Sequence, residues 1–201
     1  MLTQTTDSAP SFTDPESPRG RLLRQAAHLF RDKGYERTTV RDLAAAVGIQ
    51  SGSIFHHFRT KEEILKGVMT EAILVNTARM RERRDAAPDT RSALRALVQC
   101  ELESINGETG EAMAVLVYEW RSLSEASQAD ILKLREVYEG LWLETLEKAR
   151  AERLLEADPF ILRRFLTGAL SWTITWYRPD GDMTIEDLAG HVMTMLKIPS
   201  P

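Results

Sequence analysis

The sequence predicts an all-α protein, in which an N-terminal three-helix helix-turn-helix domain precedes a larger helical bundle, about nine helices in total. Apolar residues recur at helical spacing along most of the 201 residues, and no segment alternates apolar and polar residues as a half-buried strand does. Charge divides the chain in the same way. Residues 19–61 hold nine Lys or Arg and three Asp or Glu, although the whole chain has a formal net charge of −4. A basic segment attached to an acidic body predicts that the segment contacts a polyanion.

The first 18 residues, MLTQTTDSAPSFTDPESP, are predicted to be a disordered tail because Pro, Ser, Thr and acidic residues dominate them. They lack the basic and apolar regions of a secretory signal. No uninterrupted apolar run approaches the roughly 20 residues of a membrane-spanning helix. The single cysteine, Cys100, permits no intrachain disulfide and is typical of a reducing compartment. We therefore expect a cytoplasmic protein without a membrane partner.

The first helix is expected over residues 19–33, with its apolar residues on one face and Gly34 in the position that follows a helix. Thr38 or Thr39 is suited to cap a second helix that reaches Val47. The apolar face of the first helix consists of Leu22, Leu23, Ala26, Ala27 and Phe30.

Gly48 is predicted to end the second helix in a left-handed conformation, which glycine adopts readily. A third helix of two turns should then reach about Phe58. Thr60 and Glu63 have the spacing of a capping box and are predicted to open a fourth helix that reaches about Arg84. Further helices are expected near 89–106, 110–121, 125–151, 158–177 and 184–197.

Two short helices joined by VGIQS predict a helix-turn-helix motif over residues 39–58. Ile54, Phe55 and Phe58 should pack on the first two helices. The opposite side carries small and hydrogen-bonding residues, which suit a DNA major groove about 12 Å wide, and the helix ends should meet phosphates. The alternative is a helical hairpin with a solvated basic face. The predicted DNA-binding residues are Thr39, Arg41, Gln50, Ser51, Gly52, Ser53, His56, His57 and Lys61.

Over Thr38–Leu65, TTVRDLAAAVGIQSGSIFHHFRTKEEIL resembles the N-terminal signature of the TetR family of bacterial transcriptional regulators. The resemblance implies a DNA-binding domain over 19–65 and a ligand-binding and dimerisation domain over 66–201. It also implies a homodimeric repressor that binds double-stranded operator DNA and is controlled by a small-molecule effector. Three residues depart from the family pattern: Gln50 replaces a Ser or Thr cap, Ser51 a Lys, Arg or Pro, and Phe55 a Tyr.

Two apolar stretches of the body, residues 111–123 and 160–181, carry aromatic residues at helical spacing. Such residues belong to a core more often than to a ligand site, but together they predict an apolar pocket. The predicted ligand-binding residues are Met113, Leu116, Tyr118, Trp120, Arg121, Phe165, Trp172 and Trp176. Small residues beside the aromatics predict close helix packing between two subunits. The predicted dimer interface consists of Phe165, Ala169, Leu188, Val192, Met195 and Leu196.

A second resemblance rests on GIQSGSIFHHF at 48–58 and on WYRPDG at 176–181. Both look like TetR-family repressors of lipid and steroid catabolism, which respond to CoA thioesters. This resemblance implies an acyl-CoA effector, with arginines contacting the CoA phosphates. The alternative is that these arginines balance acids on solvated faces. The arginines concerned are Arg121, Arg163, Arg164 and Arg178.

Metal binding is not expected, because adjacent His56 and His57 point about 100° apart on a helix. No nucleophile–base pair, phosphate-binding glycine loop or pair of catalytic acids is present in the sequence, so we expect no enzyme and no cofactor. The alternative function is a helical small-molecule carrier or an adaptor protein with an incidental basic face.

Overall fold

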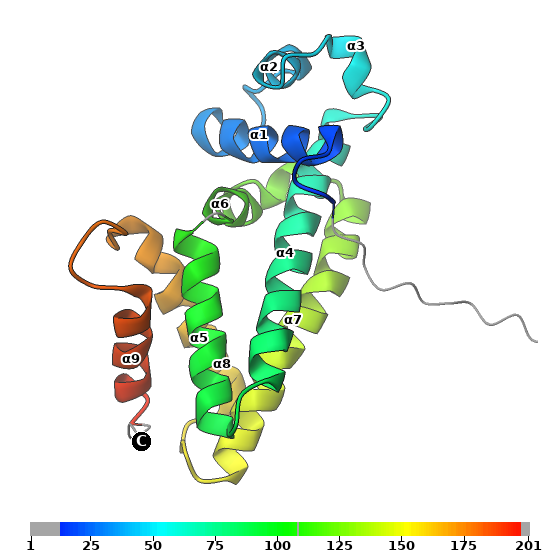
Figure 1. Cartoon of the computed structure of the whole chain (residues 1–201). Helices are drawn as coiled ribbons and strands as arrows, with labels where there is room; N and C mark the ends of the chain where they lie inside the picture. The colour runs from blue at the N-terminus through cyan, green and yellow to red at the C-terminus, as the bar shows by residue number, and fades with distance from the viewer. Residues whose placement is uncertain (1–12, 108, 198–201) are drawn as a thin grey trace, which may run out of the picture.

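A computed structural model describes residues 13–107 and 109–197, and over these residues the chain is all-helical, which confirms the predicted fold class (Figure 1). Nine α-helices and two short 3₁₀ helices occur in this part of the chain. They are α1 (Pro18–Lys33), α2 (Val40–Ala46), α3 (Ser51–Ile54), α4 (Lys61–Asp85), α5 (Thr90–Asn106), α6 (Gly110–Tyr118), η1 (Trp120–Ser122), α7 (Glu125–Ala151), α8 (Pro159–Trp172), η2 (Thr173–Thr175) and α9 (Ile185–Met195).

Helices α1–α3 form a small domain, called the head below, at one end of the molecule (Figure 1). Ser17 caps α1, and Gly34 ends it with a φ of 81° and an N–H group bonded to the Phe30 carbonyl. Thr39, not Thr38, caps α2 in a full capping box with Asp42. Gly48 has a φ of 69°, as expected for the turn of the motif. The apolar core of the head contains Leu22, Phe30, Leu43, Ile54 and Phe58.

The expected disordered tail, residues 1–18, requires a correction at its C-terminal end. Residues 1–12 lie outside the described residues. Thr13, in contrast, bonds the Glu71 carboxylate through its backbone N–H and its hydroxyl. The Ser17 N–H donates to the Asp14 carbonyl at 3.0 Å and so closes a turn before α1. Residues 13–17 therefore contact α4 through Thr13 and α1 through the carbonyls of Pro15 and Glu16, which accept hydrogen bonds from Arg24 and Arg21.

Helix α3 is shorter than expected, since it ends at Ile54 and a turn continues to His57. Its residues Ser51, Gly52 and Ser53 have low helix propensity, and the side chain of Gln50 makes no capping hydrogen bond to the first turn. The position of Phe55 is also corrected. This side chain, expected in the core, is 54% exposed.

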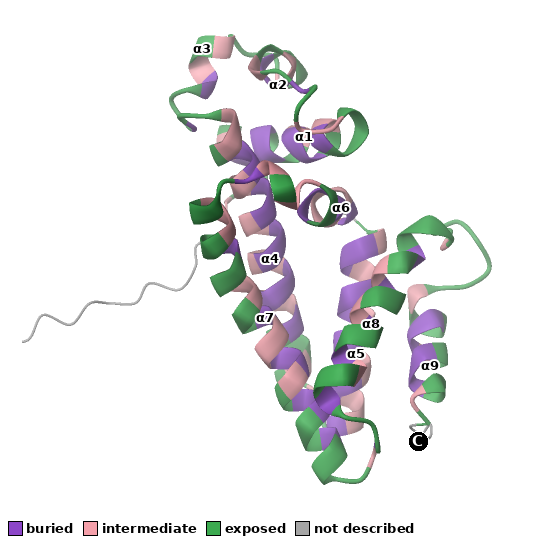
Figure 2. Ribbon diagram, turned by 180° about the vertical axis from the view of Figure 1, so that it is seen from behind, coloured by how far each residue is buried: buried purple, intermediate pink, exposed green. Residues whose placement is uncertain are grey.

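The remainder of the chain, called the body, is a bundle in which α4, α5 and α7 run side by side along the long axis (Figure 1). Helix α8 packs on α5 and α7, and α9 packs on α5. The short α6 lies across the end of the bundle, where it contacts α1, α4 and α5. Figure 2 shows the inner faces of α4 and α5 as buried and the outer side of α8 as largely exposed.

Two expected helices are interrupted. The helix expected over 110–121 ends at Tyr118 and continues as η1, and the helix expected over 158–177 ends at Trp172 and continues as η2. Threonine explains the second break: Thr173 and Thr175 donate their hydroxyls to the carbonyls of Leu170 and Trp172, at 2.6 and 2.7 Å. Such side-chain bonds compete with the regular helical pattern.

Candidate DNA-binding surface and ligand cavity

The outer side of the helix-turn-helix motif is open. Gly52, His56 and His57 are exposed, and Ser51 and Ser53 are half-buried. A Cβ atom placed on Gly48 or Gly52 would meet no atom of the chain within 4 Å. At these two glycines no side chain covers the main chain, so another molecule can approach the backbone closely. The predicted DNA-binding residues Gln50 to Ser53 form the start of α3, where Gln50 and Gly52 are exposed and Ser51 and Ser53 are half-buried.

Two further predicted contacts flank this surface at the start of α2. Thr39 and Arg41 are both exposed, although the Thr39 hydroxyl already accepts the Asp42 N–H at 3.1 Å. That hydroxyl retains its own hydrogen, which it can donate to a phosphate oxygen. Arg41 extends from the first turn of α2 into solvent, where a side chain can contact the nucleic-acid backbone.

Lys61 lies in a different environment from the one predicted. Its ammonium group donates to the carbonyls of Tyr35 and Thr38, at 2.8 and 3.0 Å. The same group lies 4.0 Å from the centre of the Tyr35 ring. Lys61 therefore ties the start of α4 to the α1–α2 loop, and one of its three N–H donors is left for the predicted phosphate contact.

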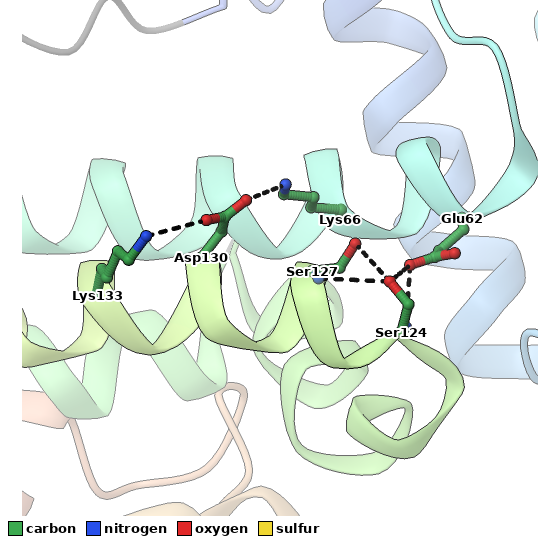
Figure 3. A network of polar contacts seen from close by, with 6 residues as sticks. All are labelled: Glu62, Lys66, Ser124, Ser127, Asp130 and Lys133. Atoms are coloured by element: carbon green, nitrogen blue, oxygen red, sulfur yellow. Dashed lines mark hydrogen bonds and ion pairs between the residues drawn. The ribbon is translucent and has the colours of Figure 1, made fainter.

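Within the body, polar contacts join the start of α4, the helix that follows the head, to the start of α7 (Figure 3). The Glu62 carboxylate accepts the N–H and the hydroxyl of Ser124 at 3.0 and 2.6 Å. These bonds, the hydroxyl bond first, lower the pKa of Glu62 below its ordinary value of 4.5. One turn further, the Lys66 ammonium group contacts the Asp130 carboxylate at 2.7 Å.

A second join connects the head to α6. The Glu111 carboxylate on α6 contacts Arg31 and His28 of α1, at 2.8 and 3.1 Å. At the far end of α6, the Glu119 carboxylate accepts the backbone N–H of Tyr35 at 3.0 Å. A displacement of α6 therefore pulls on the C-terminal half of α1 and on the loop that follows it.

The other side of α6 borders a cavity of about 350 Å³ inside the body. Its apolar wall comes from α4, α5, α6 and η1, and its polar end comes from α5, α7 and α8. The apolar residues are Ile73, Ile105, Met113, Leu116, Val117 and Trp120, and the polar ones are Glu101, Arg135, Tyr138, Glu139, Arg163, Thr167 and Ser171.

Arg163 is the centre of the polar end, and its side chain is 2% exposed. It pairs with both oxygens of Glu139 at 2.8 and 3.0 Å and with Glu101 at 3.1 Å. The Tyr138 hydroxyl donates to Glu101 at 2.9 Å. Burial, and secondly the charge of Glu101, raises the pKa of Tyr138 well above 10. Burial alone would lower the pKa of Arg163, but the two carboxylates outweigh it, so the guanidinium stays charged.

The cavity contains three of the eight predicted ligand-binding residues: Met113, Leu116 and Trp120. The other predictions are corrected because these side chains are outside the bundle. Tyr118, the last residue of α6, is 69% exposed, and Arg121 is exposed on η1. Phe165, Trp172 and Trp176 are 74%, 65% and 50% exposed. Helix α8 presents Arg163, Thr167 and Ser171 to the cavity, so Phe165, two positions after Arg163, points away from it.

The predicted dimer residues fall into two groups. Phe165, Ala169 and Met195 are exposed, and Phe165 and Ala169 lie on the outer side of α8. Leu188 and Val192 are 7% and 6% exposed because they pack into the core of their own chain, where α9 contacts α5. Leu196 is also packed against this core. Leu188 and Val192 are therefore corrected to intrachain packing, whereas the half-buried Leu196 stays a predicted interface residue.

Sequence reasoning missed most of the polar end of the cavity. Of these residues only Arg163 was singled out, and as a contact for CoA phosphates, whereas the structure pairs it with two carboxylates. Glu101 carried a usable signal, since it interrupts an apolar face made by Leu97, Val98, Leu102 and Ile105. A charged residue on a buried face requires a partner. Arg135 and Glu139 lie in a charged stretch of α7, where periodicity does not distinguish them.

Among the described residues, each helix is either too short or too polar to cross a bilayer.

Two family models match the chain. Residues 22–68 match "Bacterial regulatory proteins, tetR family", and residues 87–197 match "Tetracyclin repressor-like, C-terminal domain". A curated relative, the HTH-type transcriptional repressor KstR2 of Rhodococcus jostii (strain RHA1), is 32% identical over 197 residues, covering 93% of this chain and 94% of the relative.

Two solved structures have similar folds. The ketosteroid transcriptional regulator KstR2 of Mycobacterium tuberculosis is 26% identical with a TM-score of 0.81, and the match covers 96% of this chain and 100% of that one. A protein described as superantigen PfiT is 61% identical with a TM-score of 0.80, and the match covers 92% of this chain and 98% of that one. The matches to both domains, in the order and over the helices described above, show that the chain belongs to the TetR family of bacterial transcriptional regulators.

Proposed function

We propose that the protein is a homodimeric repressor that leaves a palindromic operator when a small apolar or acyl-CoA ligand enters the cavity. One observation carries this proposal: α6 lines the cavity with Met113, Leu116 and Val117 and holds α1 through Glu111. A ligand that displaces α6 changes the position of the head. Such coupling is typically about 1–3 kcal/mol, which changes operator affinity roughly 5–150-fold.

On the DNA side, the open face of residues 50–53 is proposed to enter the major groove, with Thr39, Arg41, His56 and His57 around it. Two heads of a dimer would then occupy half-sites about 34–36 Å apart, or a multiple of this distance. The exposed face of α8, with Phe160, Phe165 and Trp172, is proposed as the main dimer surface, because exposed aromatic patches mark interaction sites.

On the ligand side, the cavity suits the apolar part of a ligand with a polar group near Arg135. Its volume is at the lower end of the roughly 300–1,000 Å³ of small-molecule sites. A CoA moiety would have to remain outside, where Arg164 and Arg178 are exposed. Arg163 is already occupied by two carboxylates and is not proposed as a phosphate contact. The relatives named KstR2 favour a lipid-derived or steroid-derived ligand.

The DNA part is tested by selecting bound duplexes from a random pool. The proposal expects an enriched inverted repeat, a steep loss of affinity with salt, and a changed consensus for Ser53→Ala. Equal affinity for every duplex, or no binding at all, would favour a carrier or adaptor. Ligand control is tested on the enriched duplex by adding CoA thioesters and steroids, with release expected for the effector.

The 61% identity to the protein described as superantigen PfiT favours a second candidate activity. A superantigen stimulates T lymphocytes irrespective of their antigen specificity. The test is proliferation of human blood mononuclear cells exposed to endotoxin-free protein, with the heat-unfolded protein as control. Proliferation caused only by the folded protein would support this activity, and its absence would leave the regulatory function alone.

A further inference from the structure

Asn76 of α4 is a buried amide with poor hydrogen-bond partners. Asn76 is only 1% exposed. Its Nδ2 atom donates to the Met113 sulfur at 3.3 Å, and its Oδ1 atom lies 3.5 Å from the Thr109 hydroxyl oxygen. A thioether sulfur is a weak acceptor. The Thr109 hydroxyl already donates its one hydrogen to the Ser104 carbonyl at 2.9 Å, so it cannot also donate to Asn76.

Exchanging the amide oxygen and nitrogen does not remove the problem. The nitrogen would then donate to Thr109, and the oxygen would face the sulfur, which has no hydrogen to offer. In either orientation the amide makes at most one ordinary hydrogen bond. A buried amide with unmet hydrogen bonds destabilises a fold, so such a group calls for a specific explanation.

The position of Met113 supplies that explanation. Met113 lines the ligand cavity from α6, and its sulfur covers the Asn76 amide. Ile73, one helical turn before Asn76 on α4, also lines the cavity. Methionine side chains are unbranched and change rotamer easily. Rotation of this one side chain would therefore extend the cavity to the amide.

We propose that Asn76 binds the ligand: the Met113 side chain swings aside, and the Asn76 amide donates a hydrogen bond to a carbonyl oxygen of the ligand. This inference rests on the proposed ligand function of the cavity. It adds the chemical group that is recognised and places the contact on α4. That helix also begins with Lys61, which bonds the α1–α2 loop of the head. The ligand carbonyl thus contacts the helix that positions the head.

The first test compares two buried or half-buried asparagines in the free protein. Asn106 is well satisfied, since its amide nitrogen donates to the Leu102 carbonyl and the Thr173 hydroxyl, both at 2.9 Å. Replacement of Asn106 by Leu should lower the urea midpoint, whereas Asn76→Leu should leave it unchanged or raise it. An equal loss of stability for the two variants would show that the Asn76 amide is structural and would overturn the inference.

The second test uses two probes of nearly equal shape, 2-acetylnaphthalene and 2-isopropenylnaphthalene, which differ by a carbonyl oxygen in place of a methylene group. Calorimetric titration of the wild-type protein should show about ten-fold tighter binding of the ketone, since a net hydrogen bond contributes about that factor. Asn76→Leu should remove this preference. Thr167→Phe, which fills the cavity from α8, should weaken both probes equally.

The outcomes separate the two proposals. If Thr167→Phe weakens both probes but the wild-type protein binds them equally, the cavity binds ligands and the role of Asn76 is wrong. If the preference for the ketone survives Asn76→Leu, the carbonyl is recognised elsewhere and the inference also fails. If neither probe binds, or if filling the cavity has no effect, the proposed ligand function of the cavity fails, and the inference fails with it.

Discussion

The head and the body treat their polar groups in opposite ways. Among the head residues of α1–α3 and their loops, Thr38 is the one polar residue that is fully buried, and the basic side chains lie at the surface. The body buries Asn76, Glu101 and Arg163 beside its cavity. The difference fits the proposed function: a head that contacts DNA needs its charges outside, and a cavity that receives a small molecule needs polar groups inside.

The contrast is sharpest between two positively charged residues, Lys61 and Arg163. Lys61 fastens the head with hydrogen bonds to two main-chain carbonyls, whereas Arg163 neutralises carboxylates inside the body. The body arrangement is the more vulnerable one, because loss of its cation leaves buried negative charge. Substitutions that exchange or remove these groups test the comparison, and their expected effects follow from the degree of burial.

The largest effect is expected for Arg163→Met. This change leaves Glu101 and Glu139 without their cation and should lower the free energy of unfolding by about 3–5 kcal/mol, as measured by urea denaturation. Arg164→Met is the matched control, since Arg164 is exposed and stacks on the Phe160 ring. Its effect should stay within about 0.5 kcal/mol. Similar losses of unfolding free energy for both variants would show that burial of Arg163 and its carboxylates does not increase the cost of removing the arginine.

Lys61→Ala should lower the free energy of unfolding by about 1–2 kcal/mol, because the carbonyls of Tyr35 and Thr38 lose a charged donor. We expect the slope of DNA affinity against salt to remain unchanged. Arg41→Ala should behave in the reverse way, with unchanged stability and a slope reduced by about one phosphate contact. If Lys61→Ala reduces the slope and leaves the stability unchanged, the original assignment of Lys61 to phosphate binding is right.

Two glycines of the motif should respond with opposite signs. Gly48→Ala places a Cβ atom on a residue with a φ of 69° and should lower the free energy of unfolding by about 1 kcal/mol. Gly52→Ala lies in open space within α3 and should raise it by about 0.5–1 kcal/mol. Gly52→Ala should nevertheless weaken DNA binding, because the methyl group prevents close approach. Unchanged DNA affinity would place this side of α3 away from the groove.

The smallest effect concerns pH. The Ser124 bonds lower the pKa of Glu62 in the folded state below its ordinary value of 4.5. Their contribution to the free energy of unfolding is therefore fully present above pH 4.5 and is lost as the pH falls through the folded pKa. The difference in urea midpoint between the wild-type protein and Glu62→Gln should therefore shrink between neutral pH and acid. Glu125→Gln, at an exposed position of α7, should show no such change. A constant difference for Glu62→Gln would contradict the assignment.

Sequence reasoning succeeded best in the head, because its features are local. The Gly48 turn, the Thr39 cap and the spacing of Leu22, Phe30 and Leu43 each follow from neighbouring residues. Prediction failed where contacts are distant in sequence. Lys61 bonds carbonyls more than twenty residues away, and Arg163 pairs with Glu101 across 62 residues.

Periodicity also left the direction of α8 undecided. Phe165 and Trp172 share a helical stripe that suits either a pocket or a surface, and the tryptophans alone favoured a pocket. The buried Arg163 instead directs the stripe of Thr167 and Ser171 inward, because its partners Glu101 and Glu139 are on α5 and α7. The partners of one charged residue thus determined the rotation of the whole helix.

Helix α6 is a single layer between the cavity and α1. Under the proposed mechanism, a substitution in α6 that suits a new effector would also shift the resting angle of the head, so effector preference and basal transcription would change together. The cavity residues on α7 and α8, Arg135, Thr167 and Ser171, lie outside α6 and would not have this double effect. A library of variants for sensing new effectors is best confined to those positions, where a change in specificity need not raise transcription in the absence of effector.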